Sequence, residues 1–166
     1  MLLDDALRAL PVVEAAPGPI ADIGSGGGSP GIPIAASLPD RTVALVEAQR
    51  RKCDFLRRFE VELPNLEVVW GRAEEWPTDT VGVALAKALA KPPVAAELAL
   101  PLVEPGGIAV IWVGANADLD ATRVVAARLG GEMEEAPAGL LVLRKTSPTP
   151  LGFPRRAGMA KKRPLA

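Results

Sequence analysis

A glycine-rich segment at residues 22–31, which reads DIGSGGGSPG, has the composition of a ligand-binding loop. Glycines at 24, 26 and 28 carry no side chain, so the backbone there can approach a bound molecule closely and adopt positive φ angles. This spacing is common in methyltransferases, whereas Gly26, Gly28 and Gly31 also satisfy the dinucleotide-binding fingerprint. The segment therefore predicts a ligand that contains a nucleoside, and by itself it leaves S-adenosylmethionine and a dinucleotide both open.

Acidic residues at the ends of apolar runs add to this prediction. Glu47 ends the second run, where a carboxylate can accept hydrogen bonds from both hydroxyls of a ribose. Glu74 follows the third run, near the expected position of an adenine edge. Asp22 can orient the amides of the glycine loop or approach the amino acid end of the ligand. The alternative for each is a solvated loop carboxylate or a charge at a helix N-terminus. Crowding of the loop by Ser29 and prolines makes methionine a more natural ligand than pyrophosphate.

The composition excludes several kinds of catalysis. The chain has no histidine and one cysteine, Cys53, so acid–base catalysis by histidine and a Ser–His–Asp triad are both excluded. A disulfide framework is excluded as well, and we predict no metal site. We also assign no catalytic base.

The elements that must position these residues alternate between strand and helix. Apolar runs predict strands at residues 19–23, 42–46, 66–70, 81–86 and 108–113, and helices at 32–38, 50–63, 93–102 and 119–129. Residues 132–136 and 140–144 predict a terminal hairpin. Repeated strand–helix units predict an α/β, Rossmann-like fold with a mostly parallel sheet and helices on both faces. Trp70 and Trp112 lie in or beside strands, which favours core positions for both.

Charge is distributed unevenly along the chain. Residues 144–166 carry seven basic residues and no acidic one, which leaves a net charge of −8 on residues 1–143. We therefore predict a domain at residues 1–145 and a basic tail at 146–166 that binds a polyanion, the alternative being a solvated, disordered tail. No apolar run reaches membrane-spanning length, and the acidic first residues do not form a secretory signal, so we expect a soluble cytoplasmic protein.

Several segments in order along the chain resemble the RsmG (also called GidB) family, whose members methylate N7 of a guanine in 16S rRNA. They are the glycine loop continued through Pro33, LVEA at 45–48 with RKCDFL at 51–56, GRAEE at 71–75, and the tail motifs FPRRAG at 153–158 and RPL at 163–165. The resemblance implies the class I methyltransferase fold and S-adenosyl-L-methionine as cofactor. It implies cofactor contacts at Gly24, Gly26, Ser29, Glu47, Ala48, Gln49, Ala73, Glu74 and Lys87. It also implies 16S rRNA or the small ribosomal subunit particle as partner, with no membrane.

The resemblance combines with the charge pattern to predict RNA phosphate contacts at Arg155, Arg156, Lys161, Lys162 and Arg163. N7 of guanine has an in-plane lone pair and no proton to lose, so methylation there fits a chain without histidine. The chain departs from the family in having Lys87 where Arg is usual and Val113 where Lys is usual, and in lacking most of the N-terminal helical extension. These departures leave open a degenerate member that binds cofactor or RNA without methylating. A small NAD-binding oxidoreductase is the other alternative.

Overall fold

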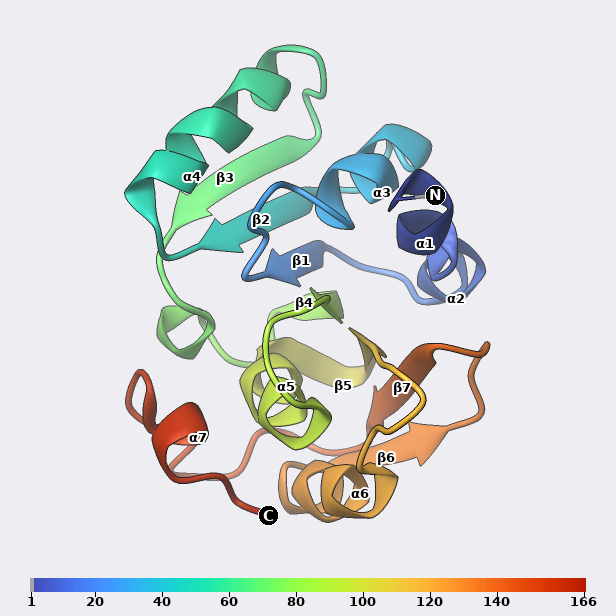
Figure 1. Ribbon diagram of the computed structural model, residues 1–166, viewed down its shortest axis with the longest axis vertical. Helices are drawn as coiled ribbons and strands as arrows, with labels where there is room; N and C mark the ends of the chain where they lie inside the picture. The colour runs from blue at the N-terminus through green and yellow to red at the C-terminus, as the bar shows by residue number, and fades with distance from the viewer. Residues whose placement is uncertain (1) are drawn as a thin grey trace.

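The centre of the structure is a mixed β-sheet with helices packed on both faces (Figure 1). The computed structural model describes residues 2–166, and within them seven strands pair in the order β3-β2-β1-β4-β5-β7-β6. The strands are β1 (Ile20–Ile23), β2 (Val43–Glu47), β3 (Leu66–Trp70), β4 (Val81–Ala86), β5 (Val103–Trp112), β6 (Gly131–Glu134) and β7 (Leu140–Lys145). β1 to β5 are parallel, and β7 runs antiparallel to both β5 and β6. The predicted fold class and the predicted terminal hairpin are both confirmed.

Two apolar clusters, one on each face of the sheet, form the core. Strand residues alternate between them: Val83 and Leu85 belong to one cluster, and Ala84 and Ala86 belong to the other. The α-helices are α1 (Leu2–Leu7), α2 (Leu10–Ala15), α3 (Gly31–Ser37), α4 (Arg50–Leu56), α5 (Pro92–Ala99), α6 (Leu119–Arg128) and α7 (Met159–Lys162). Helices α2, α3 and α4 contribute to the first cluster, whereas α5, α6 and α7 contribute to the second. Strands buried on both faces explain the nearly continuous apolar runs in the sequence.

Two expectations from the sequence are modified. The helix predicted at 50–63 ends at Leu56 and continues as a 3₁₀ helix, Arg57–Val61. Trp112 is partly buried and its indole donates to the Asp5 carbonyl at 2.9 Å, but the expectation of a core position for Trp70 is wrong. β3 is the edge strand of the sheet, and Trp70 at its end is 58% exposed.

The C-terminal segment, residues 146–166, packs back on the sheet and on α5. Lys145 at the end of β7 is fully buried, and its ammonium donates to Asp79 and Thr149 side chains and to two backbone carbonyls. Further along, Arg155 pairs with Glu97 of α5, which is 3% exposed. These contacts bring α7 to the edge of the sheet where the parallel strands end (Figure 1). None of the helices in residues 2–166 has the length and apolar character needed to cross a membrane.

Candidate functional site

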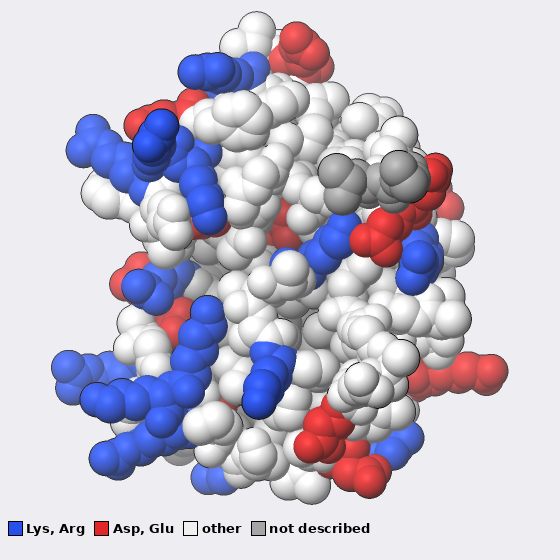
Figure 2. Space-filling model, viewed as in Figure 1, with Lys and Arg blue, Asp and Glu red and all other residues white. Residues whose placement is uncertain are grey.

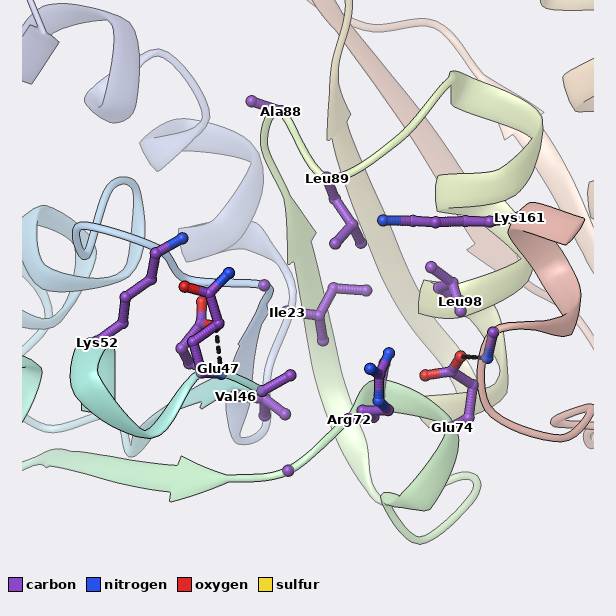
Figure 3. A pocket seen from close by; sticks show the side chains of 16 residues that line it. Ile23, Val46, Glu47, Lys52, Arg72, Glu74, Ala88, Leu89, Leu98 and Lys161 are labelled. Carbon is purple, nitrogen blue, oxygen red and sulfur yellow. Dashed lines mark hydrogen bonds between the residues drawn. The ribbon is translucent and has the colours of Figure 1, made fainter. Parts of the chain in front are cut away.

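A cavity of about 380 Å³ lies at the carboxyl ends of β1 to β4 (Figure 3). Its walls come from six places: the end of β1, the end of β2 with the start of α4, the segment after β3, the segment after β4, α5 through Leu98, and the C-terminal tail. Open α/β sheets bind ligands at this edge. The predicted cofactor contacts Gly24, Glu47, Ala48, Gln49, Ala73 and Glu74 all line the cavity.

The glycine loop is held in shape from below by Asp22. Its carboxylate accepts a hydrogen bond from the Gly31 amide at 3.1 Å, as the sequence led us to expect, and a Cβ at Gly31 would lie 2.7 Å from the same oxygen. Gly24 and Gly28 have φ angles of 69° and 95°, which L side chains rarely adopt. Burial raises the pKa of the Asp22 carboxyl to about 7, and the hydrogen bond from Gly31 offsets this only in part. The Asp22 carboxyl therefore gains or loses its proton near neutral pH.

Glu47 presents a fixed carboxylate to the cavity. One of its oxygens accepts from the Gly26 amide and the other from the Gln49 amide, both at 2.8 Å, and the residue is 5% exposed. A carboxylate has about four acceptor positions, so about two remain for a ligand after these bonds. Hydroxyl pairs such as those of a ribose match this acceptor. The predicted residues Gly26 and Gln49 thus act on Glu47 through their backbone amides.

The tail forms one wall of the cavity through a contact with Glu74. The Glu74 carboxylate accepts a hydrogen bond from the amide of Gly158 at 2.9 Å, and the dashed line in Figure 3 marks it. Gly158 and Lys161 line the cavity from this side, while Lys52 of α4 lies on the opposite side (Figure 3). Nothing in the periodicity of the sequence indicated that the tail reaches the cavity.

Ser29 and Lys87 lie together but outside the cavity wall. The Lys87 ammonium contacts the Ser29 hydroxyl at 3.3 Å and forms an ion pair with Asp5 of α1 at 2.6 Å. Ser29 is part of the glycine loop, and Lys87 lies close enough to the loop that its charge offsets part of the rise in the pKa of Asp22. The short N-terminal helix is thereby tied to the end of β4.

The basic residues predicted for RNA contact divide into two kinds. Arg155 is committed to a bidentate pair with Glu97, at 2.6 and 2.8 Å, and it also donates to the Arg163 carbonyl. Arg156, Lys161, Lys162 and Arg163 are exposed. In Figure 2 basic side chains gather at the lower left, the region where Figure 1 places α7. The contacts with RNA remain a prediction.

The sequence reading missed a second basic group. Arg50, Arg51 and Lys52 open α4 and are exposed, and Arg72 lies nearby at the cavity. Basic side chains gather at the upper left of Figure 2, where Figure 1 places α4, and the tail lies at the lower left. The sequence RRK at residues 50–52 could have indicated this basic surface. Adjacent residues of a helix point in different directions, however, so three basic residues in a row do not by themselves predict a shared basic surface.

The side chains available for metal binding and for nucleophilic attack limit the chemistry that this site can perform. In the part of the chain that the structure describes, no cluster of three or more His, Cys, Asp or Glu side chains forms a metal-binding group. Cys53 is buried, its thiol donates to the Glu47 carbonyl at 3.2 Å, and burial raises the pKa of that thiol. A thiol in this environment is a poor nucleophile, because the thiolate is the reactive form.

Comparisons with known proteins agree on one family. A family model described as GidB, rRNA small subunit methyltransferase G, matches residues 1–134. The chain is 38% identical to the ribosomal RNA small subunit methyltransferase G of Rubrobacter xylanophilus, over 90% of this chain and 66% of that protein. It is 36% identical to that of Synechococcus elongatus, over 89% of this chain and 69% of the relative. The chain thus spans about two thirds of the length of these relatives.

Solved structures show the same fold at low sequence identity. The crystal structure of the CurJ carbon methyltransferase matches with a TM-score of 0.68 at 13% identity, over 87% of this chain and 54% of that one. TYW2 of M. jannaschii in complex with AdoMet matches with a TM-score of 0.61 at 14% identity, over 76% of this chain and 65% of that one.

Proposed function

The chain belongs to the GidB family of rRNA small subunit methyltransferases G, and from this premise we propose that it transfers a methyl group from S-adenosyl-L-methionine to small-subunit ribosomal RNA. We propose N7 of a guanine as the acceptor atom. The observation that carries the proposal is the Glu47 carboxylate, fixed by two amides inside a cavity at the carboxyl edge of the sheet.

The residues present fit this cofactor. The partly satisfied Glu47 carboxylate suits the ribose hydroxyls, and the glycine loop offers side-chain-free backbone to the rest of the molecule. We propose that the cofactor is held by Gly24, Gly26, Glu47, Ala48, Gln49, Ala73 and Glu74. Ser29 and Lys87 stabilise the glycine loop through their contact with each other. When bound, the cofactor supplies an electrophilic methyl group on a sulfonium.

The part played by this chain's own residues is positioning. Guanine N7 carries an available lone pair and loses no proton, so the chain needs no general base, in keeping with its lack of histidine. Holding the acceptor and the methyl group in line lowers the barrier by proximity, an effect that can amount to several kcal/mol, roughly 7–11 at best. The buried Asp22 keeps the loop rigid during this step through its bond to Gly31.

The tail supplies cations for the RNA. We propose that Arg156, Lys161, Lys162 and Arg163 contact phosphates, which sets the position of the RNA but not the choice of base. Arg155 contributes by anchoring the tail on Glu97. In this proposal residues 1–145 form the methyltransferase domain, and residues 146–166 form a tail that contacts RNA. The protein acts in the cytoplasm, and its substrate is 16S rRNA or the small-subunit particle.

The experiment that tests this proposal is transfer of labelled methyl groups to bacterial small-subunit RNA and to assembled particles, with the modified nucleotide mapped. Calorimetric binding of S-adenosyl-L-methionine runs beside it. Label on guanine N7 supports the proposal, and the better acceptor identifies RNA or particle as substrate. Cofactor binding without transfer to either acceptor would point to the degenerate reading, and no cofactor binding would refute the proposal.

A further inference from the structure

Trp70 is a large aromatic side chain that does not line the cofactor cavity. It ends the edge strand β3, it is 58% exposed, and its indole N–H donates to the Ala48 carbonyl at 3.1 Å. The hydrogen bond fixes the orientation of the ring beside the end of β2. An indole held in place with more than half of its surface exposed leaves apolar ring surface open to a partner.

A second hollow surrounds this ring. It is lined by Ala48, Trp70, Gly71, Arg72 and Glu75. Ala48, Gly71 and Arg72 also line the cofactor cavity, so the two hollows are contiguous. The Arg50 guanidinium lies 5.5 Å from the centre of the indole, in cation–π range. Ring and cation together form a platform of the kind on which nucleobases stack.

The basic side chains near the platform favour a polyanion as the ligand. Arg51 and Lys52 are exposed on the same helix as Arg50, and the Glu75 carboxylate accepts a hydrogen bond from the backbone amide of Arg72 at 3.1 Å. Across the cofactor cavity lie the exposed cations of the tail, so basic side chains flank the cavity on both sides (Figure 2). A single-stranded segment of RNA that crosses this mouth meets cations for its phosphates and, at Trp70, an aromatic face for a base.

We propose that Trp70, with Arg50 and Arg72, forms a stacking subsite for an unpaired base of the RNA substrate that neighbours the methylated nucleotide. The inference rests on the proposed function, since it assumes that RNA lies across the cofactor cavity. It adds a second RNA-binding wall, on β3 and α4, to the wall formed by the tail. Stacking of this kind tolerates any base, because every base has a π face.

The test measures binding of single-stranded oligonucleotides from small-subunit RNA to the full chain, followed by tryptophan fluorescence and by filter binding. Trp70→Ala is expected to weaken binding by about 10- to 100-fold, the range for loss of one base–aromatic stack. Trp70→Phe is expected to retain most of the affinity but to lose the RNA-dependent fluorescence quenching. Val124→Ala on α6, where the side chain is 59% exposed, is the matched control and is expected to bind like the unaltered chain.

The salt dependence separates stacking from charge. Trp70→Ala is expected to lower affinity at every salt concentration without changing the slope of log K against log salt. Arg51→Gln is expected to reduce that slope by about 0.7, the contribution of one phosphate contact on a single strand. A changed slope in Trp70→Ala would mean that the indole acts only by holding the cations in place, and it would overturn the stacking subsite.

The outcomes also distinguish this inference from the proposed function. Methyl transfer by the unaltered chain with unchanged RNA affinity in Trp70→Ala overturns the subsite and leaves the function standing. Failure of the unaltered chain to bind RNA overturns both. RNA binding without methyl transfer overturns the proposed function alone, because the RNA affinity of Trp70→Ala still tests the subsite. Weaker cofactor binding in Trp70→Ala, measured by calorimetry, would assign the indole to the cofactor cavity instead. If Trp70→Ala fails to fold, the Trp70→Phe quenching measurement still decides.

Discussion

The Glu74 carboxylate accepts a 2.9 Å hydrogen bond from the Gly158 amide, which joins the segment after β3 to a residue 84 positions later in the chain. This contact makes the basic tail a wall of the cavity in which we propose that the cofactor binds (Figure 3). The segment proposed to contact RNA therefore also touches the space proposed for the cofactor. Each of the two ligands is expected to order the same tail, which is a physical route to cooperative binding.

Glu74→Ala is expected to loosen the tail. Loss of a hydrogen bond to a charged acceptor removes roughly 1.5–3 kcal/mol from the local stability of the tail. Hydrogen exchange at the amides of α7 should become about tenfold faster or more, and cofactor affinity should fall. Glu62→Ala, which alters an exposed carboxylate far from the tail contact, serves as the control. Equal exchange rates in both variants would show that the tail is held without Glu74.

Glu47→Gln is expected to weaken cofactor binding by about tenfold or more, a loss of at least about 1.4 kcal/mol. The carboxamide keeps the shape of the side chain but places an NH₂ group against the Gly26 or Gln49 amide, where an oxygen accepts in the unaltered chain. Calorimetry with S-adenosyl-L-methionine measures the change. Glu67→Gln on β3, an exposed position, should bind as the unaltered chain does. Unchanged affinity in Glu47→Gln would remove Glu47 from the cofactor site.

Asp22 is expected to make stability depend on pH. Its pKa rises from an ordinary 3.8 to about 7 in the fold because it is buried, so the folded chain holds the proton more tightly than the unfolded chain. This contribution is fully present below the unfolded pKa and is lost as pH rises toward the folded pKa. Relative to Asp22→Asn, the free energy of unfolding should fall by about 1 kcal/mol per pH unit between about pH 5 and about pH 7.

Urea unfolding of both chains across this range measures the effect, with Asp40→Asn at an exposed position as control. The difference between the unaltered chain and Asp22→Asn should level off above the folded pKa. A difference that is flat with pH would contradict the raised pKa of Asp22.

Lys145→Met is expected to destabilise the chain by about 3 kcal/mol. Lys145 is fully buried, and its removal leaves the Asp79 carboxylate without its cation. Burial by itself would raise the pKa of Asp79, but hydrogen bonds from Lys145 and Thr149 hold it below its ordinary value. The double variant Asp79→Asn with Lys145→Met should recover part of the loss, because no uncompensated charge then remains.

The neighbouring residue offers a control for this prediction. Arg144 forms a bidentate pair with Glu134 at the surface, and Arg144→Met should cost about 1 kcal/mol or less. Denaturant midpoints of the three variants compare the two pairs directly. Equal losses for Lys145→Met and Arg144→Met would show that burial of Lys145 adds nothing.

The order of elements, the glycine loop and the place of Glu47 at the cavity were all predictable from the sequence. Each depends on local information: an apolar run predicts a strand, and glycines between a strand and a helix predict a turn at the carboxyl edge. Once the strands are parallel, Gly24, Glu47 and Ala73 must come to the same edge, because each lies at or just after the carboxyl end of a strand. The predicted hairpin, β6 with β7, followed in the same way from two short runs joined by the segment Pro-Ala-Gly at residues 137–139.

Only the tertiary structure decided the roles of the charged and aromatic residues. Lys145 and Arg155 are both among the seven basic residues of the segment 144–166. In the structure Lys145 is buried in a network with Asp79, and Arg155 is paired with Glu97. Trp70 has the pattern of a core residue, yet it ends an edge strand and is exposed. The physical reason is the same in each case. The type of a side chain is fixed locally, but its burial and its partner depend on which distant segment packs against it. The hydrophobic periodicity of a sequence reports only on neighbouring residues, so it does not predict such long-range contacts.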